Sequence, residues 1–307
     1  MPRRAADVAD LLTGHVVDSA YAVGWSLVRA LPEPAAQRLF RAGADLAAHR
    51  GAPAVDRLRA NLTRVAPDRD PDLLVRDGLR SYARYWCEVF RLPVTSAERI
   101  QSGMHLVDPG HRLRGAVEAG RGVVLALPHT GNWDHAGAWL VGQGVPFTTV
   151  AERLRPEQLY DRFVAFREGL GMEVLPLTGG VPPFEVLAER LRAGRALCLV
   201  ADRDLSASGV DVDFFGAATR MPAGPAALAL RTGAALLPVT LSFEPNGWRA
   251  VIHPQVEPSD VSRMTQVVAD AFARGIAEHP ADWHMLQRLW LEDLPLHDPR
   301  RAKNGAA

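Results

Sequence analysis

Lysine is nearly absent from this chain: Lys303 is the single lysine among 35 basic residues in a sequence of 307. Arginine supplies the rest, either because its guanidinium binds phosphate and carboxylate in bidentate geometry or, more simply, because a GC-rich genome favours arginine codons. Acidic residues also number 35, so the formal net charge is zero. This balance argues against a nucleic-acid protein held by a bulk basic surface.

Cysteine and long apolar runs are also scarce. Cys87 and Cys198 stand far apart without metal-type spacing, so we expect neither a disulfide framework nor a zinc centre. The most apolar early stretch, residues 15–32, contains Asp18 and Arg29 and falls short of the roughly 20 apolar residues that cross a bilayer. The N-terminus lacks a continuous apolar region and a cleavage site, so no signal peptide is expected.

Two interpretations of that early stretch stay open. Tyr21 and Trp25 can anchor an amphipathic segment at a membrane surface, because such rings prefer the interface. The same segment can instead be a helix packed on the core of the domain.

The order of predicted elements indicates one α/β domain over residues 1–295, followed by a polar tail at 296–307. Residues 1–120 have the pattern of helices separated by Pro, Gly and Asp, which predicts a helical N-terminal layer. From 121 to 295, short apolar strands alternate with helical segments, which predicts a mostly parallel central sheet covered by helices. A hairpin predicted over residues 235–258 adds antiparallel pairing, so the sheet should be mixed.

The stretch LALPHTGNWDHAGAWL, residues 125–140, concentrates polar chemistry after an apolar strand. His129 falls at the carboxyl edge of the sheet, where open α/β folds bind ligands. If a helix begins near Asn132, the Asp134 carboxylate turns back and holds Nδ1 of His129, which leaves Nε2 as a general base. No GxSxG motif is present, so the activated hydroxyl belongs to the substrate and attacks an acyl donor directly. The alternative is a loop histidine at a helix start, with Trp133 in the core.

HTGNWD, residues 129–134, matches the HX4D motif of glycerolipid-type acyltransferases. The chain resembles the branch that contains the bacterial lipid A late acyltransferases and the actinobacterial phosphatidylinositol mannoside acyltransferases. Residues 151–168 resemble its second block, and residues 201–234 resemble its third and fourth, which carry an acidic residue, FFG and a Gly-Pro helix. The likeness covers residues 10–295.

This resemblance implies transfer of a long fatty acyl chain from acyl-CoA, with palmitoyl-CoA as the expected donor, to a mannose hydroxyl of a phosphatidylinositol mannoside. It implies no cofactor or metal, and a peripheral enzyme on the cytoplasmic face of the plasma membrane. Another glycolipid or a lysophospholipid is the alternative acceptor, and a non-catalytic lipid-binding protein is the alternative class. The sequence does not give the acyl-chain length, the hydroxyl or the oligomeric state.

We therefore expect His129 and Asp134 to be catalytic. The residues expected to bind substrate are Asn132, Trp133, Glu152, Arg167, Asp202, Arg203, Asp204, Phe214, Phe215, Gly216, Arg220 and Gly224.

Two loops of the predicted sheet edge and the helix predicted over about residues 156–170 supply five of the six charged members of this set. Glu152 ends a strand, and Arg167 can pair with it or with a phosphate, although a purely structural ion pair is an equal alternative. The triplet from Asp202 to Asp204 ends the strand ALCLVA at the same edge.

Asn132 and Trp133 belong to the HTGNWD motif, and the remaining members belong to the FFG and Gly-Pro blocks. Phe214 and Phe215 are expected to wall an acyl channel, with Gly216 allowing the turn. Gly224 opens a helix whose N-terminus can support an oxyanion or phosphate, or can simply begin a helix without a ligand.

Other kinds of site are less well supported. A metal hydrolase would use His129, Asp134 and His135. Asp134 and His135 are adjacent, however, so on a helix their side chains point about 100° apart and would not share a metal with His129, and no other ligand stands out. Cys198 lies in an apolar strand, where a free thiol behaves as a small hydrophobe. The sequence from Gly142 to Gly144 lacks the third glycine of a dinucleotide-binding loop.

Overall fold

Proline lies at the start of three consecutive N-terminal helices, because its fixed φ suits the first helical turn. Gly51, with a φ of 61°, ends the first of them, and the Asp70 side chain caps the third by accepting from two backbone N–H groups. These helices, in the computed structural model, are α2 (Glu33–Arg50), α3 (Pro53–Val65) and α4 (Pro71–Arg91). The structure describes residues 24–153, 157–178, 182–204, 209–298 and 301.

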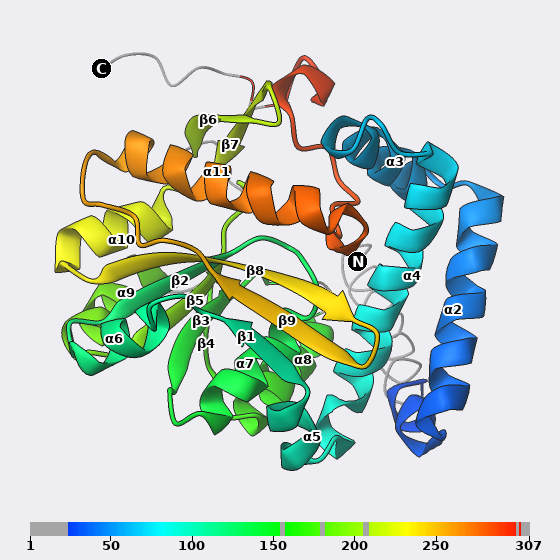
Figure 1. Ribbon diagram of the computed structural model, residues 1–307, viewed down its shortest axis with the longest axis horizontal. Coiled ribbons are helices and arrows are strands. Elements are labelled where there is room, and N and C mark those ends of the chain that lie inside the picture. Colours follow the sequence, from blue (N-terminus) through cyan, green and yellow to red (C-terminus); the bar gives the residue numbers. More distant parts are fainter. Residues whose placement is uncertain (1–23, 154–156, 179–181, 205–208, 299–300, 302–307) are drawn as a thin grey trace, which may run out of the picture.

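A seven-stranded sheet with the order β1-β9-β8-β2-β5-β3-β4 forms the centre of the fold (Figure 1). Neighbouring strands are parallel except for the β8–β9 hairpin. The predicted mixed, mostly parallel sheet is thus confirmed. Its strands are β1 (Met104–Val107), β2 (Val123–Leu127), β3 (Phe147–Ala151), β4 (Glu173–Pro176), β5 (Ala196–Val200), β8 (Ala235–Glu244) and β9 (Gly247–Ile252).

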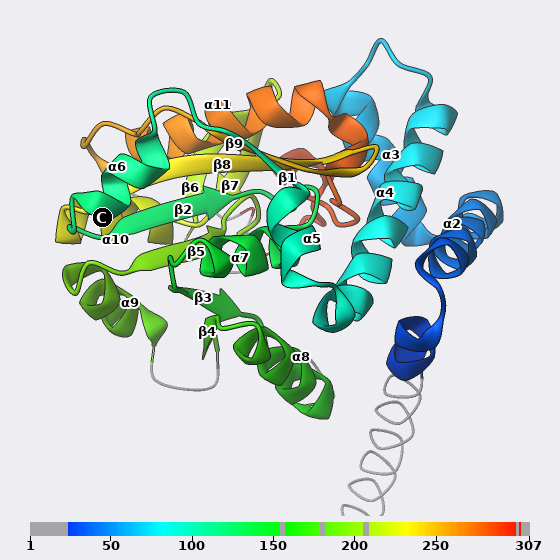
Figure 2. The ribbon, with the colours of Figure 1, turned by 60° about the horizontal axis from the view of Figure 1, so that its bottom comes forward.

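Helices cover both faces of this sheet (Figure 2). One face packs against α9 (Pro183–Arg192), α10 (Gly224–Thr232) and α11 (Val261–Glu278). The other packs against α5 (Ala97–Ser102), α6 (Arg112–Glu118), α7 (Trp133–Gly142) and α8 (Glu157–Gly169). Side chains of β2 alternate between the two core clusters: Val124 and Ala126 join the first, and Leu125 and Leu127 join the second. A strand buried on both faces reads as a continuous apolar run, which explains GVVLALP.

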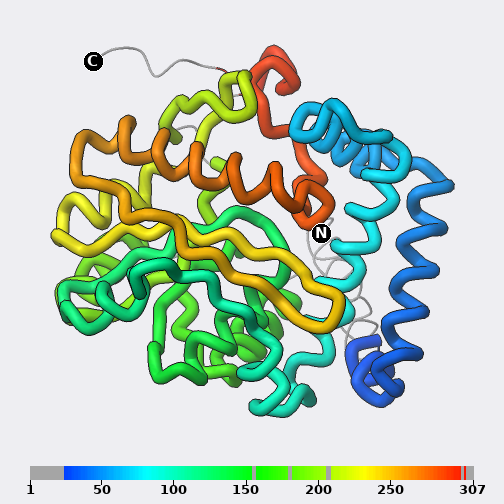
Figure 3. Tube along the Cα trace, viewed as in Figure 1, coloured from blue at the N-terminus to red at the C-terminus, as the bar shows by residue number. Residues whose placement is uncertain are grey.

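Helix α4 closes one end of the sheet, with α2 on its outer side (Figure 3). Its residues Leu74 and Leu79 join the first core cluster, and Tyr85 and Val89 join the second. The guanidinium of Arg80 binds Asp45 of α2 through two hydrogen bonds of 2.6 and 2.8 Å. The N-terminal helices are therefore part of both cores.

The N-terminal region differs from the predicted helical layer by one strand, and it resolves the position of Trp25. Strand β1 lies inside the stretch predicted as a helical layer, so the sheet begins before residue 120. Trp25 is 6% exposed, packs against Phe90 and Phe166, and donates its indole N–H to the Phe90 carbonyl at 2.8 Å. This contact favours core packing for Trp25; Tyr21 lies outside the described residues. Within the described ranges, no helix combines the length and apolarity needed to cross a membrane.

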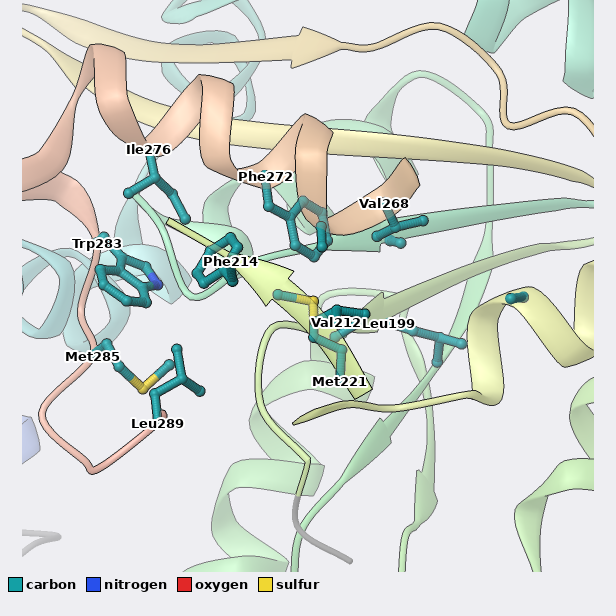
Figure 4. Packing of buried hydrophobic residues seen from close by; sticks show 14 of the residues in the cluster. Leu199, Val212, Phe214, Met221, Val268, Phe272, Ile276, Trp283, Met285 and Leu289 are labelled. Atoms are coloured by element: carbon teal, nitrogen blue, oxygen red, sulfur yellow. The ribbon is translucent and has the colours of Figure 1, made fainter. Parts of the chain in front are cut away.

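The C-terminal segment after α11 returns to the core. Figure 4 shows Trp283 and Met285 of this segment beside Ile276 and Phe272 of α11 and Phe214 of a separate hairpin. That hairpin consists of β6 (Val210–Phe214) and β7 (Ala217–Met221).

A buried asparagine ties this segment to α3. The Asn61 amide donates to the carbonyls of Met285 and Gln287 at 2.7 and 2.9 Å. Asn61→Ala leaves both carbonyls without this donor, so we expect the free energy of unfolding to fall by about 2 kcal/mol. Urea unfolding measures it, with the exposed Gln37→Ala as the control. An unchanged midpoint and slope for the Asn61 variant would show that the segment is held by other contacts.

Candidate active site

His129 lies at the carboxyl edge of the sheet, two residues after β2, and contacts a buried acid there. Its Nδ1 is 2.5 Å from Asp202 Oδ1, and its backbone N–H donates to Asp202 Oδ2 at 2.9 Å. Asp202 follows β5, which pairs in parallel with β2, so the two strands bring these residues together. The His129 side chain is 29% exposed and that of Asp202 is 0% exposed. The imidazole therefore has a buried side, held by Asp202, and an accessible side.

The electrostatics of Asp202 favour its ionised form. Burial alone would raise the pKa of this carboxyl, but the His129 charge and the hydrogen bonds from His129 and Trp283 outweigh burial and lower it. An ionised carboxylate only accepts hydrogen bonds, so Nδ1 is the donor, and in the neutral form of the ring the lone pair is on Nε2. Among the described residues, no hydrogen bond reaches Nε2.

Asp134 does not contact His129, and the predicted pairing of these two residues is wrong. The Asp134 carboxylate instead binds Arg167 Nε of α8 at 2.7 Å and accepts from the Tyr85 hydroxyl of α4 at 2.9 Å. Helix α7 begins at Trp133 because the Asn132 side chain caps it, so Asp134 points from its first turn toward α4 and α8 rather than back along the chain.

Asp134, Arg167 and Tyr85 form a largely buried, hydrogen-bonded triad. Burial alone would lower the pKa of Arg167, but the Asp134 charge and hydrogen bond outweigh it, so the pKa is raised. The pKa of Tyr85 is also raised well above its ordinary value, first by burial and then by the Asp134 charge. Asp134 thus links three helices through charge and hydrogen bonds.

An apolar pocket lies under the sheet beside this triad. Trp133, Asp134 and Arg167 line it near the sheet edge, and it extends between β2, β5, α7 and Met172. The Trp133 ring stands between two aromatic neighbours, 5.6 Å from the His129 ring and 4.1 Å from the Tyr85 ring. Trp133 therefore lines the pocket and also contacts the His129 ring.

Arg167 does not pair with Glu152, contrary to one of the two sequence interpretations. Glu152, which follows β3, is 3.4 Å from the guanidinium of Arg203, which follows β5. Both lie on the same sheet edge as His129, so charged groups do gather there. Arg203 is the partner because Asp134 already holds Arg167.

Three of the expected substrate-binding residues are engaged in holding the fold. Asn132 caps α7 with its oxygen and donates its amide to Glu88 at 2.7 Å. Asp204 accepts the backbone N–H of Gly209 at 2.9 Å. Arg220 is 3% exposed and binds Asp211 across the β6–β7 hairpin at 2.6 Å. Through these contacts the three side chains stabilise the backbone and the hairpin around the site.

The FFG block does not wall the apolar pocket. Phe214 is 1% exposed and belongs to the core cluster on the opposite face of the sheet. Phe215 and Gly216, with φ of 54° and 74°, form the turn of the β6–β7 hairpin, which requires left-handed backbone. Gly224 begins α10 as predicted.

Sequence reasoning missed two contributors. Tyr85 is one of several aromatic residues of α4, and only its hydroxyl contact with Asp134 indicates a role at the site. Trp283 donates its indole N–H to Asp202 Oδ2 at 2.9 Å, from a segment with no motif that points to the site.

Neither rival chemistry finds support in this geometry. In the described part of the chain, no group of three His, Cys, Asp or Glu side chains is placed to hold a metal ion. His135 stacks on Trp248 with ring centroids 3.5 Å apart, and burial lowers its pKa to about 4. Burial also raises the pKa of the Cys198 thiol far above its usual range, which removes the thiolate that a nucleophile needs.

Comparisons with known proteins agree with one another. Residues 6–292 match the family model described as bacterial lipid A biosynthesis acyltransferase. The chain is 58% identical over 300 residues to a phosphatidylinositol mannoside acyltransferase of Mycolicibacterium smegmatis, covering 96% of this chain and 97% of that protein. It is 53% identical over 304 residues to a phosphatidylinositol mannoside acyltransferase of Mycobacterium tuberculosis, covering 97% and 95%.

The buried Asp134–Arg167 pair yields a prediction about stability. Asp134→Leu leaves the Arg167 charge uncompensated, so we expect a loss of about 3 kcal/mol in the free energy of unfolding. Adding Arg167→Met replaces the whole pair by apolar side chains and should restore most of that loss. Urea unfolding of the two single variants and the double variant measures the coupling. Additive losses would contradict the pairing.

Proposed function

This chain belongs to the bacterial lipid A biosynthesis acyltransferase family, and on that basis we propose that it transfers a long fatty acyl chain from acyl-CoA to a mannose hydroxyl of a phosphatidylinositol mannoside. The printed names of its relatives support this acceptor. Acyl-CoA as donor, palmitoyl-CoA in the first instance, and the chemistry below are part of the proposal.

The observation that carries the mechanism is the contact between His129 and Asp202. With Nδ1 held by the buried carboxylate, Nε2 takes the proton of the acceptor hydroxyl as the oxygen attacks the thioester carbonyl. The carbon–sulfur bond then breaks, and the imidazolium gives its proton to the departing CoA sulfur. Asp202 orients the ring and stabilises its charged form. No acyl-enzyme is formed on this route.

The apolar pocket is suited to the fatty chain. Its sides are aliphatic residues of β2, β5, β8 and β9, and it runs inward from Trp133, next to His129. Its volume of about 70 Å³ is small for a long acyl chain, so binding of the chain has to displace side chains. Met172 is the most adaptable of these, because its thioether chain is unbranched.

The polar acceptor then approaches from the exposed side of His129. Glu152 and Arg203 lie at this edge, where a carboxylate can bind sugar hydroxyls and a guanidinium can bind phosphate. Leu27, Leu39 and Leu46 are each at least 50% exposed, on residues 24–30 and α2, and offer apolar contact to a membrane surface. We place the enzyme as a peripheral protein on the cytoplasmic face of the plasma membrane.

The test of the base is an assay by mass spectrometry with purified protein, acyl-CoA and a panel of acceptors. His129→Ala should lower turnover at least about 10²-fold, and Asp202→Asn about as much, because each removes part of the base. His105→Ala is the control, since His105 is exposed and pairs with Glu244, away from the His129–Asp202 contact. Wild-type rates in a folded His129 variant would refute the mechanism, and transfer to a lysophospholipid instead of the glycolipid would refute the acceptor.

Cys198 gives a matched pair of substitutions inside the pocket. Cys198→Ala should keep most activity, because the thiol is not a nucleophile. Cys198→Phe adds bulk where the residue lines the pocket, so the preferred acyl-CoA should become shorter. A panel of donors of increasing chain length measures the preference. An unchanged preference in the Phe variant, with normal stability, would show that the chain binds elsewhere.

A further inference from the structure

The Asp202 carboxylate accepts three hydrogen bonds, and one of them comes from outside the strands that form the site. His129 supplies two donors, its ring Nδ1 to Oδ1 and its backbone N–H to Oδ2. The third donor is the indole N–H of Trp283, 2.9 Å from Oδ2. Trp283 comes from the C-terminal segment, more than 80 residues later in the chain.

This segment is fixed against the His129 loop by its backbone. Residues 282–284 run antiparallel to residues 129–131, with a bridge between Thr130 and Trp283. The Gly131 N–H donates to the Asp282 carbonyl at 2.9 Å, and the His284 N–H donates to the His129 carbonyl at 2.8 Å. The Trp283 indole therefore has a defined position relative to the loop that carries the base.

The Trp283 ring has little freedom to turn away. It is 0% exposed and lies among Phe214, Ile276 and Met285 in the core (Figure 4). Trp290, also 0% exposed, packs edge-on against it with ring centroids 6.0 Å apart. A rigid donor on Oδ2 holds the carboxylate plane and leaves Oδ1 for the imidazole.

We propose that Trp283 is a positioning residue for acyl transfer, which acts on His129 through Asp202 by holding the carboxylate and drawing charge toward Oδ2. The inference rests on the proposed function. Without the indole donor, more negative charge faces Nδ1 and the imidazolium is better stabilised, so the base stays protonated to higher pH. A carboxylate that can rotate also places the ring less well, which slows the chemical step.

Other ionisable groups around the pair limit the interpretation of a pH profile. Burial, with the charge of His129, lowers the pKa of His284 to about 3, so this ring stays neutral in the working range. Burial raises the pKa of Asp282, which accepts from Ser81 and from the Phe243 N–H. Glu152 and Arg203 pair at the exposed side. A control variant that leaves all these groups in place is therefore needed.

Trp290 supplies that control. Like Trp283, it is 0% exposed and belongs to the first core cluster. Its indole N–H, however, donates to the Phe214 carbonyl at 2.8 Å instead of to Asp202. Trp283→Phe and Trp290→Phe each remove one buried indole, so the loss of packing is matched. We expect the acid limb of the kcat/KM profile to move up by about half a pH unit in the Trp283 variant alone, with kcat about tenfold lower.

A second measurement requires no substrate. Diethyl pyrocarbonate modifies neutral imidazole, so its rate of reaction with His129, followed by peptide mass spectrometry across about pH 5.5 to 8.5, should show the same upward shift. If Trp283→Phe does not fold, 3-benzothienylalanine at position 283 keeps the two-ring shape and lacks only the N–H donor.

Two results would overturn the inference: identical profiles for the two tryptophan variants in both measurements, or a shift of the Trp283 variant to lower pH. If no variant or wild-type protein transfers acyl groups but the modification profile still shifts, the proposed function fails while the positioning of His129 by Trp283 stands.

Discussion

The pairing of a fully buried carboxylate with a partly exposed imidazole is the constraint on which the site depends. An unpaired charge at the position of Asp202 would cost several kcal/mol, because it has lost its hydration. His129 compensates with two donors, and it reaches Asp202 only because β2 and β5 are adjacent and parallel. The strand order of the sheet therefore determines which acid holds the His129 ring.

The acid of the HTGNWD motif, Asp134, has a different role in this structure. Asp134 joins α7 to α8 through Arg167 and to α4 through Tyr85, and these residues frame the end of the apolar pocket nearest His129. The four-residue spacing between His129 and Asp134 spans a loop and a helix start, so it places the two side chains on different walls. The motif thus contributes His129 to the contact with Asp202 and Asp134 to the residues that line the pocket.

The spacing of apolar residues and the Pro, Gly and Asp residues between predicted elements were enough to predict most of the fold. The hairpin predicted over residues 235–258 matches β8 and β9, and the alternation of strands and helices predicted the mixed sheet. Strand β1 was missed because its four residues are only partly buried and carry no alternating pattern. In the site, His129 and Asp202 were both named, but their contact was not, because it depends on strand order. Trp283 could not be found from sequence, since its role arises from a chain reversal more than 80 residues after Asp202.

The alternation of side chains along the central strands has a consequence for how such an enzyme can diverge. On β5, Cys198 faces the apolar pocket while its neighbour Leu199 packs in the cluster beneath α11. If the pocket holds the acyl chain as proposed, substitutions at the pocket-facing positions of β5 change the choice of substrate, while those at the alternate positions change the packing beneath α11. The lipid preference can then change without disturbing the face that holds Trp283 against Asp202.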